Sequence, residues 1–413
     1  DQTVDATSTA IRQFTGDYRG WPTQFNGQLG AWERTNPQPL GGKYDAKEVF
    51  GEALLPLLRD SAIGYSADLN AAIRYTDYST SGGVTTWKIG GTYEPIPDIR
   101  IRATRSRDIR APNLTEMYTG PSSSQGTLTD PFQPTTSPAY RPVVNTLSVG
   151  NPLLNPEKAD TTTIGVVFKP RAIPGFTASI DYFDITIKDA IGTLGGQVTI
   201  DQCFGGATAL CSLLPRGPDG VLNAVQTPFL NISERSTSGI DFEVAYSTRL
   251  GAGTASVRTL ATYVKKLQTK FPGAATLDVA GQTGPGRGGV PNLGVPHWTV
   301  NVDVGYQGES WSISAINRFL GAGILDVNNT PNLLAPSLNR VKSAFYTDAT
   351  VTKKFDIFGA KTEFFLTITN LFNKAPPPAP RTYFVFGTYY GGTNPALFDL
   401  LGRQYTAGIR FNF

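Results

Sequence analysis

The last nine residues of the chain constrain its fold more than any other stretch. Apolar and polar side chains alternate strictly along them. The apolar positions are Tyr405, Ala407, Ile409, Phe411 and Phe413, and the polar positions between them are Thr406, Gly408, Arg410 and Asn412. A period of two predicts a β-strand with one apolar and one polar face. An aromatic face opposite a charged face is typical of a membrane barrel with a wet lumen, although a soluble sheet can end in the same way.

The same alternation recurs upstream, in the stretches 298–306 and 240–246. In both, an aromatic ends the apolar face, where a girdle at the membrane interface would need one. A third apolar face begins in the stretch 176–187, and its phase slips by one between Tyr182 and Phe183. Such a slip predicts a β-bulge at that point.

Extending this search predicts about thirteen strands. They lie near 45–56, 66–79, 83–94, 98–108, 158–169, 175–188, 233–249, 253–266, 296–306, 310–321, 342–355, 361–373 and 401–413. Many are longer than the five or six residues of an ordinary strand. A tilted strand needs about ten residues to cross the hydrocarbon of a membrane. The lengths therefore favour an all-β, transmembrane antiparallel barrel.

The connections between these strands alternate between tight turns and long segments. The long segments are 109–157, 189–232, 267–295, 322–341 and 374–400. Soluble domains seldom contain so many long loops without structure, whereas outer-membrane barrels combine short periplasmic turns with long extracellular loops. We therefore expect a periplasmic C-terminus. Counting back, residues 1–44 are expected to form an extracellular loop or a partly ordered N-terminal segment, and residues 45–413 the barrel.

The composition agrees with a membrane barrel and excludes other classes. Charged residues make up only 17% of the chain, against about a quarter in soluble domains. No apolar run is long enough for a membrane-spanning helix, but barrel strands escape such a search. A net charge of +3 gives no reason to expect a nucleic-acid partner. A soluble β-sandwich or adhesin remains an alternative, which extraction without detergent would reveal.

Four stretches resemble the TonB-dependent receptor family of Gram-negative outer membranes, and they occur in the order found in that family. They are 99–118 (IRIRATRSRDIRAPNLTEMY), 151–159 (NPLLNPEKA), 368–373 (ITNLFN) and 401–405 (LGRQY). The resemblance covers about 45–413. It implies a 22-stranded barrel in the outer membrane, as in plugged transporters, and the TonB-powered uptake of a bulky nutrient such as a siderophore or a saccharide.

The chain departs from this family pattern because it contains neither a plug domain nor the first strands. Thirteen is also an odd number, whereas bacterial single-chain barrels have even numbers of strands. One further strand within 1–44 would make the number even. We expect an N-terminal plug-and-barrel portion from a separate chain, through which TonB would act. Outer-membrane lipid and a small-molecule nutrient are the other expected partners. The alternative is a passive outer-membrane channel or a structural barrel subunit.

Charged residues at inward positions of the predicted strands are candidates for facing the lumen or the plug. They are Arg102, Asp181, Asp241, Glu243, Asp303, Asp348, Glu363 and Arg410. Facing lipid, each would cost a few kcal/mol at the membrane midplane. Solvation of the lumen and ion pairs along the wall are the simpler interpretation of any one of them.

Aromatic residues in the long loops are candidates for binding substrate. They are Tyr118, Tyr140, Tyr383, Phe386, Tyr389 and Tyr390. Aromatic faces suit sugar rings and flat catechol-like ligands, but packing within the loops explains such residues equally well. The tyrosines around 389 favour saccharides or other non-iron nutrients.

The cysteines and the single histidine give little reason to expect catalysis or metal binding. Cys203 and Cys211 are expected to form a disulfide in an exported protein, with two unrelated thiols as the alternative. His297 is the only histidine, so a catalytic triad would have to use it, and no partner lies nearby in sequence. One histidine and two cysteines do not make a zinc pattern. We therefore expect no enzyme, no metal and no cofactor.

Overall fold

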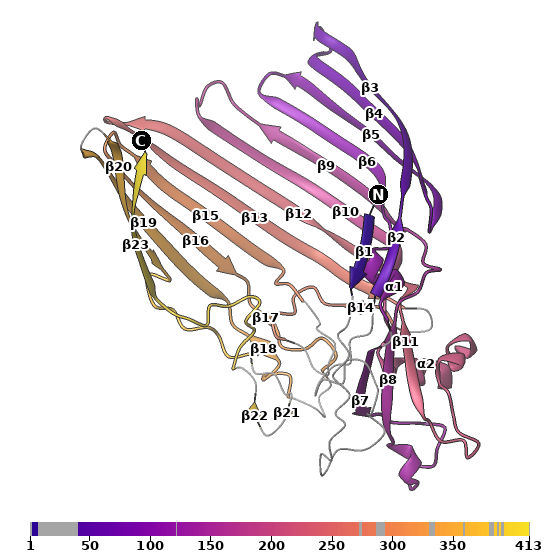
Figure 1. The fold of residues 1–413 in the computed structure, drawn as a ribbon. Coiled ribbons are helices and arrows are strands. Elements are labelled where there is room, and N and C mark those ends of the chain that lie inside the picture. Colours follow the sequence, from indigo (N-terminus) through magenta and orange to yellow (C-terminus); the bar gives the residue numbers. More distant parts are fainter. Residues whose placement is uncertain are drawn as a thin grey trace.

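In the computed structural model, thirteen long strands follow one another in a single antiparallel sheet, with the short strand β14 (Leu277–Asp278) beside it (Figure 1). The thirteen predicted strands and the all-β class are confirmed. The structure describes residues 2–6, 40–120, 122–271, 275–285, 294–329, 335–357, 360–379, 384–385, 388–389 and 392–412.

The thirteen strands pair in the order in which they occur in the chain, from β3 to β23. Their bounds are β3 (Ala46–Ser61), β4 (Gly64–Tyr78), β5 (Gly82–Ile96), β6 (Ile99–Arg110), β9 (Glu157–Phe168), β10 (Phe176–Gly192), β12 (Leu230–Leu250), β13 (Gly253–Lys270), β15 (Trp298–Gln307), β16 (Trp311–Leu320), β19 (Ala344–Ile357), β20 (Ala360–Thr369) and β23 (Gln404–Asn412). Most run past the predicted ends, but β20 stops short of 373. Asn370 and Asn373 adopt left-handed φ angles of 48° and 50° there, which end the strand.

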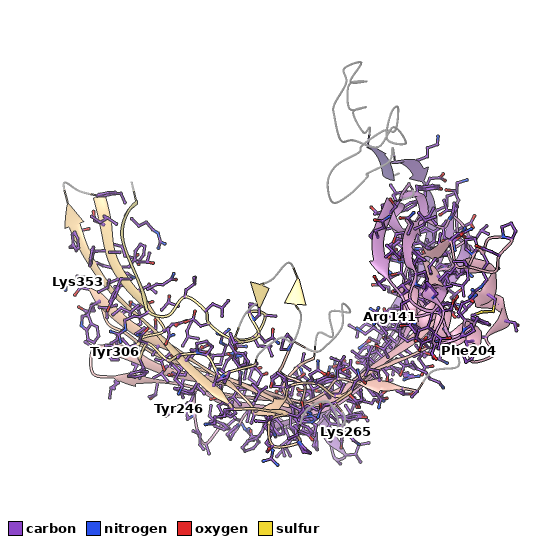
Figure 2. All side chains as sticks on the ribbon, turned by 90° about the horizontal axis from the view of Figure 1, so that it is seen from below. Arg141, Phe204, Tyr246, Lys265, Tyr306 and Lys353 are labelled. Atoms are coloured by element: carbon purple, nitrogen blue, oxygen red, sulfur yellow. A yellow bond between two sulfur atoms is a disulfide. The ribbon has the colours of Figure 1, made fainter. Side chains whose placement is uncertain are left out.

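The sheet curves into an open arc, with β3 and β23 as its two edges (Figure 2). The tight turns lie together at one end of the strands, and the long connections lie together at the other (Figure 1). We call these the turn end and the loop end. Their separation is the pattern on which the predicted orientation rests.

The two faces of the sheet differ in polarity. Tyr246 and Tyr306, which end two of the alternating apolar faces, lie along the convex side of the arc in Figure 2. Ile180 and Ile409 belong to the same side and are 44% and 58% exposed. Charged and polar residues occupy the positions between them, so they face the concave side. The arc thus has an apolar outer face and a polar inner face.

The β-bulge predicted between Tyr182 and Phe183 is wrong. β10 keeps an unbroken register with both neighbours from Ala178 to Ile187. Phe183 instead points to the inner face, where Gly239 opposite it leaves room for its ring. The apolar residues change face in the half of β10 that lies towards the loop end.

Two long connections, predicted as loops without structure, are in fact folded. The first holds α1 (Leu114–Tyr118), β7 (Ser122–Thr127), η2 (Pro138–Tyr140) and β8 (Val143–Val149), and the second holds α2 (Gly196–Phe204), η3 (Thr208–Leu213) and β11 (Ala224–Pro228). β8 pairs with β7 and, in parallel, with β11, which joins the two connections in one small sheet. We call residues 122–149 and 196–228 the loop subdomain.

The other connections carry shorter elements. They are β17 (Gly323–Ile324), β18 (Arg340–Val341), β21 (Phe384–Val385) and β22 (Thr388–Tyr389). Leu325, Tyr346 and Phe398 belong to an apolar cluster that packs these connections together. Within 1–44, β1 (Gln2–Ala6) pairs with β2 (Leu40–Tyr44), and residues 7–39 lie outside the described part. None of the described helices is long and apolar enough to cross a membrane.

Candidate functional site: the charged inner face

All eight charged residues proposed for the lumen lie on the inner face of the sheet. Arg102 pairs in register with Gly165, and Gly165 pairs with Asp181. Asp181 in turn pairs with Asp241, and Glu243 lies two residues further along the same strand. Because register partners in a sheet point to the same side, these four charged residues share one face.

The register continues this face to the C-terminal edge. Asp303 pairs with Ile316, and Ile316 pairs with Asp348. Glu363 pairs with Arg410 at the far edge. The charged face therefore extends across the strands from β6 to β23. Contact with a plug or a substrate remains a proposal for each of these residues.

Arg102 and Asp181 form a two-pronged ion pair on this face, although a whole strand separates them. Arg102 donates from Nε to Asp181 Oδ1 and from Nη2 to Oδ2, both at 2.7 Å. The pair passes directly over Gly165 of β9. A Cβ added there would lie 1.8 Å from Asp181 Oδ1. The glycine is thus what allows β6 and β10 to be bridged across β9.

Polar partners also balance the other carboxylates at the centre of the face. Thr262 donates to Asp241 Oδ1 at 2.7 Å, and Arg258 Nε donates to Glu243 Oε1 at 2.8 Å. Arg258 and Asp303 line a shallow pocket on the same face. Asp241 and Asp181 stand opposite each other in register, so these separate partners relieve the repulsion between two adjacent carboxylates.

The C-terminal part of the face ties strands to the last long connection. Asp348 Oδ1 accepts a hydrogen bond from the Asn370 backbone N–H at 2.7 Å. The Asn370 side chain donates to Asp399 Oδ2 at 2.6 Å, and its oxygen accepts from the Lys374 N–H at 2.7 Å. Asp348 is therefore part of a fixed junction. Glu363 and Arg410 make a looser pair of 3.8 Å.

A second charged cluster, at the loop end, was missed by sequence reasoning. Arg110 binds Glu157 of β9 twice, at 2.8 Å each, and Glu116 of α1 at 2.9 and 3.0 Å. Glu157 also accepts the Ile191 N–H of β10 at 2.7 Å. Asn113 and Glu116 form a capping box on α1. The Asn-x-x-Glu spacing was the signal that could have revealed this capping box, though not its link to Arg110 and Glu157.

The loop subdomain is held by a buried ion pair and a disulfide. Asp130, with no exposed surface, accepts from Arg216 at 2.6 and 2.9 Å. The Arg216 guanidinium lies 4.8 Å from the centre of the Phe132 ring, which makes an edge contact with Phe204 at 5.0 Å. Figure 2 shows Phe204 beside the disulfide. Connections with such internal packing form a fixed platform.

The expected disulfide between Cys203 and Cys211 is present and joins α2 to η3. Cys203 is buried in an apolar cluster with Val144, Ile200 and Val225. The disulfide therefore holds η3 of the second connection close to the core that the two connections share. Both predicted cysteines thus act in the structure of the loop subdomain.

The aromatic candidates for substrate binding are dispersed. The Tyr118 ring lies against Gly42 of β2, and Tyr140 lies in η2 of the loop subdomain. Within the described residues, no hydrogen bond or ring contact joins these two tyrosines. Tyr389 lies in β22, and nothing is described of its side chain. Tyr383, Phe386 and Tyr390 lie outside the described residues.

His297 takes part in packing at the start of β15. Its ring stacks on Tyr263 at 5.8 Å, and its Nδ1 lies 2.7 Å from the Val264 carbonyl oxygen. Tyr263 also contacts Trp298 at 5.0 Å. No group of three potential ligands for a metal ion occurs among the residues that the structure describes. The position suits an interfacial residue in an aromatic cluster near the loop end.

Comparison with protein families gives one match over nearly the whole chain. A family model described as "TonB dependent receptor-like, beta-barrel" matches residues 2–371. No curated protein matches the chain significantly.

Several solved structures share the fold. The siderophore receptor PirA from Acinetobacter baumannii is 17% identical, with a TM-score of 0.56 over 91% of this chain and 46% of its own. A mutant ferric enterobactin receptor, PfeA, from Pseudomonas aeruginosa is 15% identical, with a TM-score of 0.60 over 90% of this chain and 45% of its own. The FrpB iron transporter from Neisseria meningitidis is 16% identical, with a TM-score of 0.50 over 90% and 46%. The chain thus spans about half the length of these proteins.

Proposed function

The chain belongs to the TonB-dependent receptor β-barrel family, which places it in the outer membrane of a Gram-negative bacterium, and we propose that it forms the later strands of an active transporter for a bulky nutrient. Proteins of this family are transporters and not enzymes. The observation that carries the proposal is the face of charged residues across the concave side of the arc, opposite an apolar convex side. A polar lumen wall backed by lipid requires that arrangement.

In this proposal the arc is part of a larger barrel of about 22 strands. Its edges, β3 and β23, have no further partner among the described strands. Unpaired edges are costly in a membrane, because hydrocarbon offers no partner to backbone groups. The closing strands and a plug would come from a separate chain, and TonB would act through that chain.

The loop end would face the outside of the cell and capture the nutrient. The folded loop subdomain and the junction around Asn370 support this role, because a preorganised surface loses less entropy when it binds a ligand. Siderophores and saccharides both belong to the expected class of bulky nutrients. Tyr118, Tyr140, Tyr383, Phe386, Tyr389 and Tyr390 remain proposed contacts.

Uptake assays in cells with and without TonB test the proposal. Cells that carry the complete transporter should accumulate a ferric siderophore or a labelled oligosaccharide only when TonB and the proton gradient are intact. A passive channel instead predicts uptake that is the same in both strains. Equal uptake with and without TonB would therefore overturn the active-transport function.

A pull-down tests the split arrangement separately. The tagged chain is extracted in mild detergent and its partners are identified by mass spectrometry. We expect a plug-bearing polypeptide in a one-to-one ratio. A closed barrel that purifies without a second chain would contradict the split arrangement, and so would a single longer polypeptide that carries plug, first strands and this sequence together.

A further inference from the structure

A group of basic residues occupies the outer face of the sheet between the apolar band and the loop end. Lys158 and Lys188 are direct register partners on β9 and β10. Arg107 pairs with Asp160 on the same face, and Arg105 pairs with Thr162. We call this group the outer basic patch. It consists of Arg105, Arg107, Lys158, Lys188, Lys265 and Lys266.

The patch faces away from the concave side. Ile101 and Ile164 lie on the same faces of β6 and β9, further from the loop end, and both are exposed apolar residues of the outer face. Lys265 is the extra residue at the register shift between β12 and β13, and Figure 2 shows it on the convex side. The patch therefore lies where a barrel meets the membrane surface.

The charges within the patch are not balanced. Arg107 binds Asp160 at 2.8 Å, and Lys266 lies 3.2 Å from Asp184. Asp160 also interacts electrostatically with Arg105 and Lys188. Among the described residues, these two carboxylates are the acidic groups paired with the patch, and they face six basic side chains.

The pairing of Lys158 with Lys188 is the most informative contact. Like charges directly opposite each other destabilise a sheet, and both side chains are exposed. No ion pair to either lysine occurs within the described part of the chain. An anion placed between the two ammonium groups would turn this repulsion into attraction.

An aromatic cluster marks the level of the membrane interface just below the patch. Tyr263 contacts Trp298, and Trp298 stacks on Phe242, on the outer face of neighbouring strands. Tyrosine and tryptophan gather at the level of lipid headgroups. Lys266 follows Tyr263 three residues closer to the loop end. The patch is thus placed at headgroup height.

We propose that the outer basic patch binds the phosphate groups of an anionic glycolipid in the outer leaflet. The proposal goes beyond transport and rests on the proposed orientation, in which the loop end faces outside. Basic side chains beside a membrane strengthen the binding of anionic headgroups. Lys158 and Lys188 would hold one phosphate between them, while the apolar band below contacts the acyl chains.

The test compares a double variant, Lys158→Gln with Lys188→Gln, with a matched control. The control replaces Lys47 and Lys353, two exposed lysines on the outer face of other strands, by glutamine. Each complete transporter is purified in detergent, reconstituted in nanodiscs and titrated with phosphorylated glycolipid. We expect affinity to fall roughly fivefold per lysine removed from the patch, and not in the control.

Three further outcomes decide the proposal. Dephosphorylated glycolipid should bind the native protein as weakly as phosphorylated glycolipid binds the double variant. Inorganic phosphate at millimolar concentration should not displace the lipid, because it lacks the acyl chains. Equal affinity in the double variant and the control would overturn the proposal, whether or not uptake depends on TonB. Circular dichroism of both variants checks that each sheet is folded.

Discussion

At the scale of the residue, Gly165 decides whether the two charged strands beside it can meet. The Arg102–Asp181 pair occupies the space that any side chain at 165 would need. A charge-assisted bidentate pair is among the stronger polar contacts in proteins. Its partners are 79 residues apart, so it also fixes the relative register of β6, β9 and β10.

We expect Gly165→Ala to separate Arg102 from Asp181 and to lower the free energy of unfolding by about 1–3 kcal/mol. The added Cβ would lie far inside contact distance of the carboxylate. Urea unfolding in lipid vesicles measures the change. Gly51→Ala in β3 is the control, because no atom lies within 4 Å of a Cβ added there. Equal stability of both variants would show that the pair is unimportant.

The side on which each charged residue lies could be predicted, but its partner could not. A period of two assigns Asp241 and Arg410 to the polar face from local sequence alone. The partner of Arg102 lies two strands away and depends on register, which non-local pairing sets. The Arg110 cluster was missed for the same reason, since Glu116 and Glu157 come from different elements.

At the scale of the element, the loop subdomain shows what a local search cannot find. β8 and β11 are short, and their pairing is parallel between two separate connections. Neither stretch has a long alternating pattern, because each buries only a few residues such as Val144 and Val225. The sequence therefore predicted loops without structure for these two connections, although they share a core.

The buried Asp130–Arg216 pair should control the stability of this subdomain. We expect Asp130→Asn to destabilise it locally by about 2–4 kcal/mol, because the Arg216 charge then lacks a partner. Hydrogen exchange of the amides in α2, β8 and β11 measures the local opening, while the amides of β12 serve as an internal reference.

The double variant with Arg216→Gln supplies the control. Removing both charges should cost less than removing the carboxylate alone, because no unpaired charge is left in the core. If the two substitutions are instead additive, the ion pair does not hold the subdomain together. Exchange that also rises in β12 would show that the subdomain and the sheet open as one unit.

At the scale of the whole molecule, strand number and the two faces followed from the sequence, whereas the shape of the sheet did not. The local alternation of apolar and polar residues predicts thirteen long strands and the two faces of each, as β15 and β23 illustrate. The arc depends on how neighbouring strands twist and stagger, which is a property of the complete assembly. The predicted orientation and the split arrangement stay predictions.

The assignment of faces leads to a prediction for two neighbouring residues of β10. We expect Ile180→Arg on the outer face to lower stability in lipid vesicles by about 2–4 kcal/mol. Ser179→Arg on the inner face should be nearly neutral, because Glu243 is its register partner. Unfolding both variants in the same vesicles measures the difference. A smaller loss for Ile180→Arg than for Ser179→Arg would reverse the assignment of faces.

The two open edges of the arc have a consequence for how much of this protein a cell can keep. A row of unpaired backbone groups on β3 or β23 is a template for aggregation. Chains whose edges find no closing strands would be removed by proteases of the cell envelope. If the closing strands come from a separate chain, as proposed above, we expect the steady-state amount of this chain to follow the supply of that chain. Stoichiometry between the two would then be enforced by degradation after synthesis.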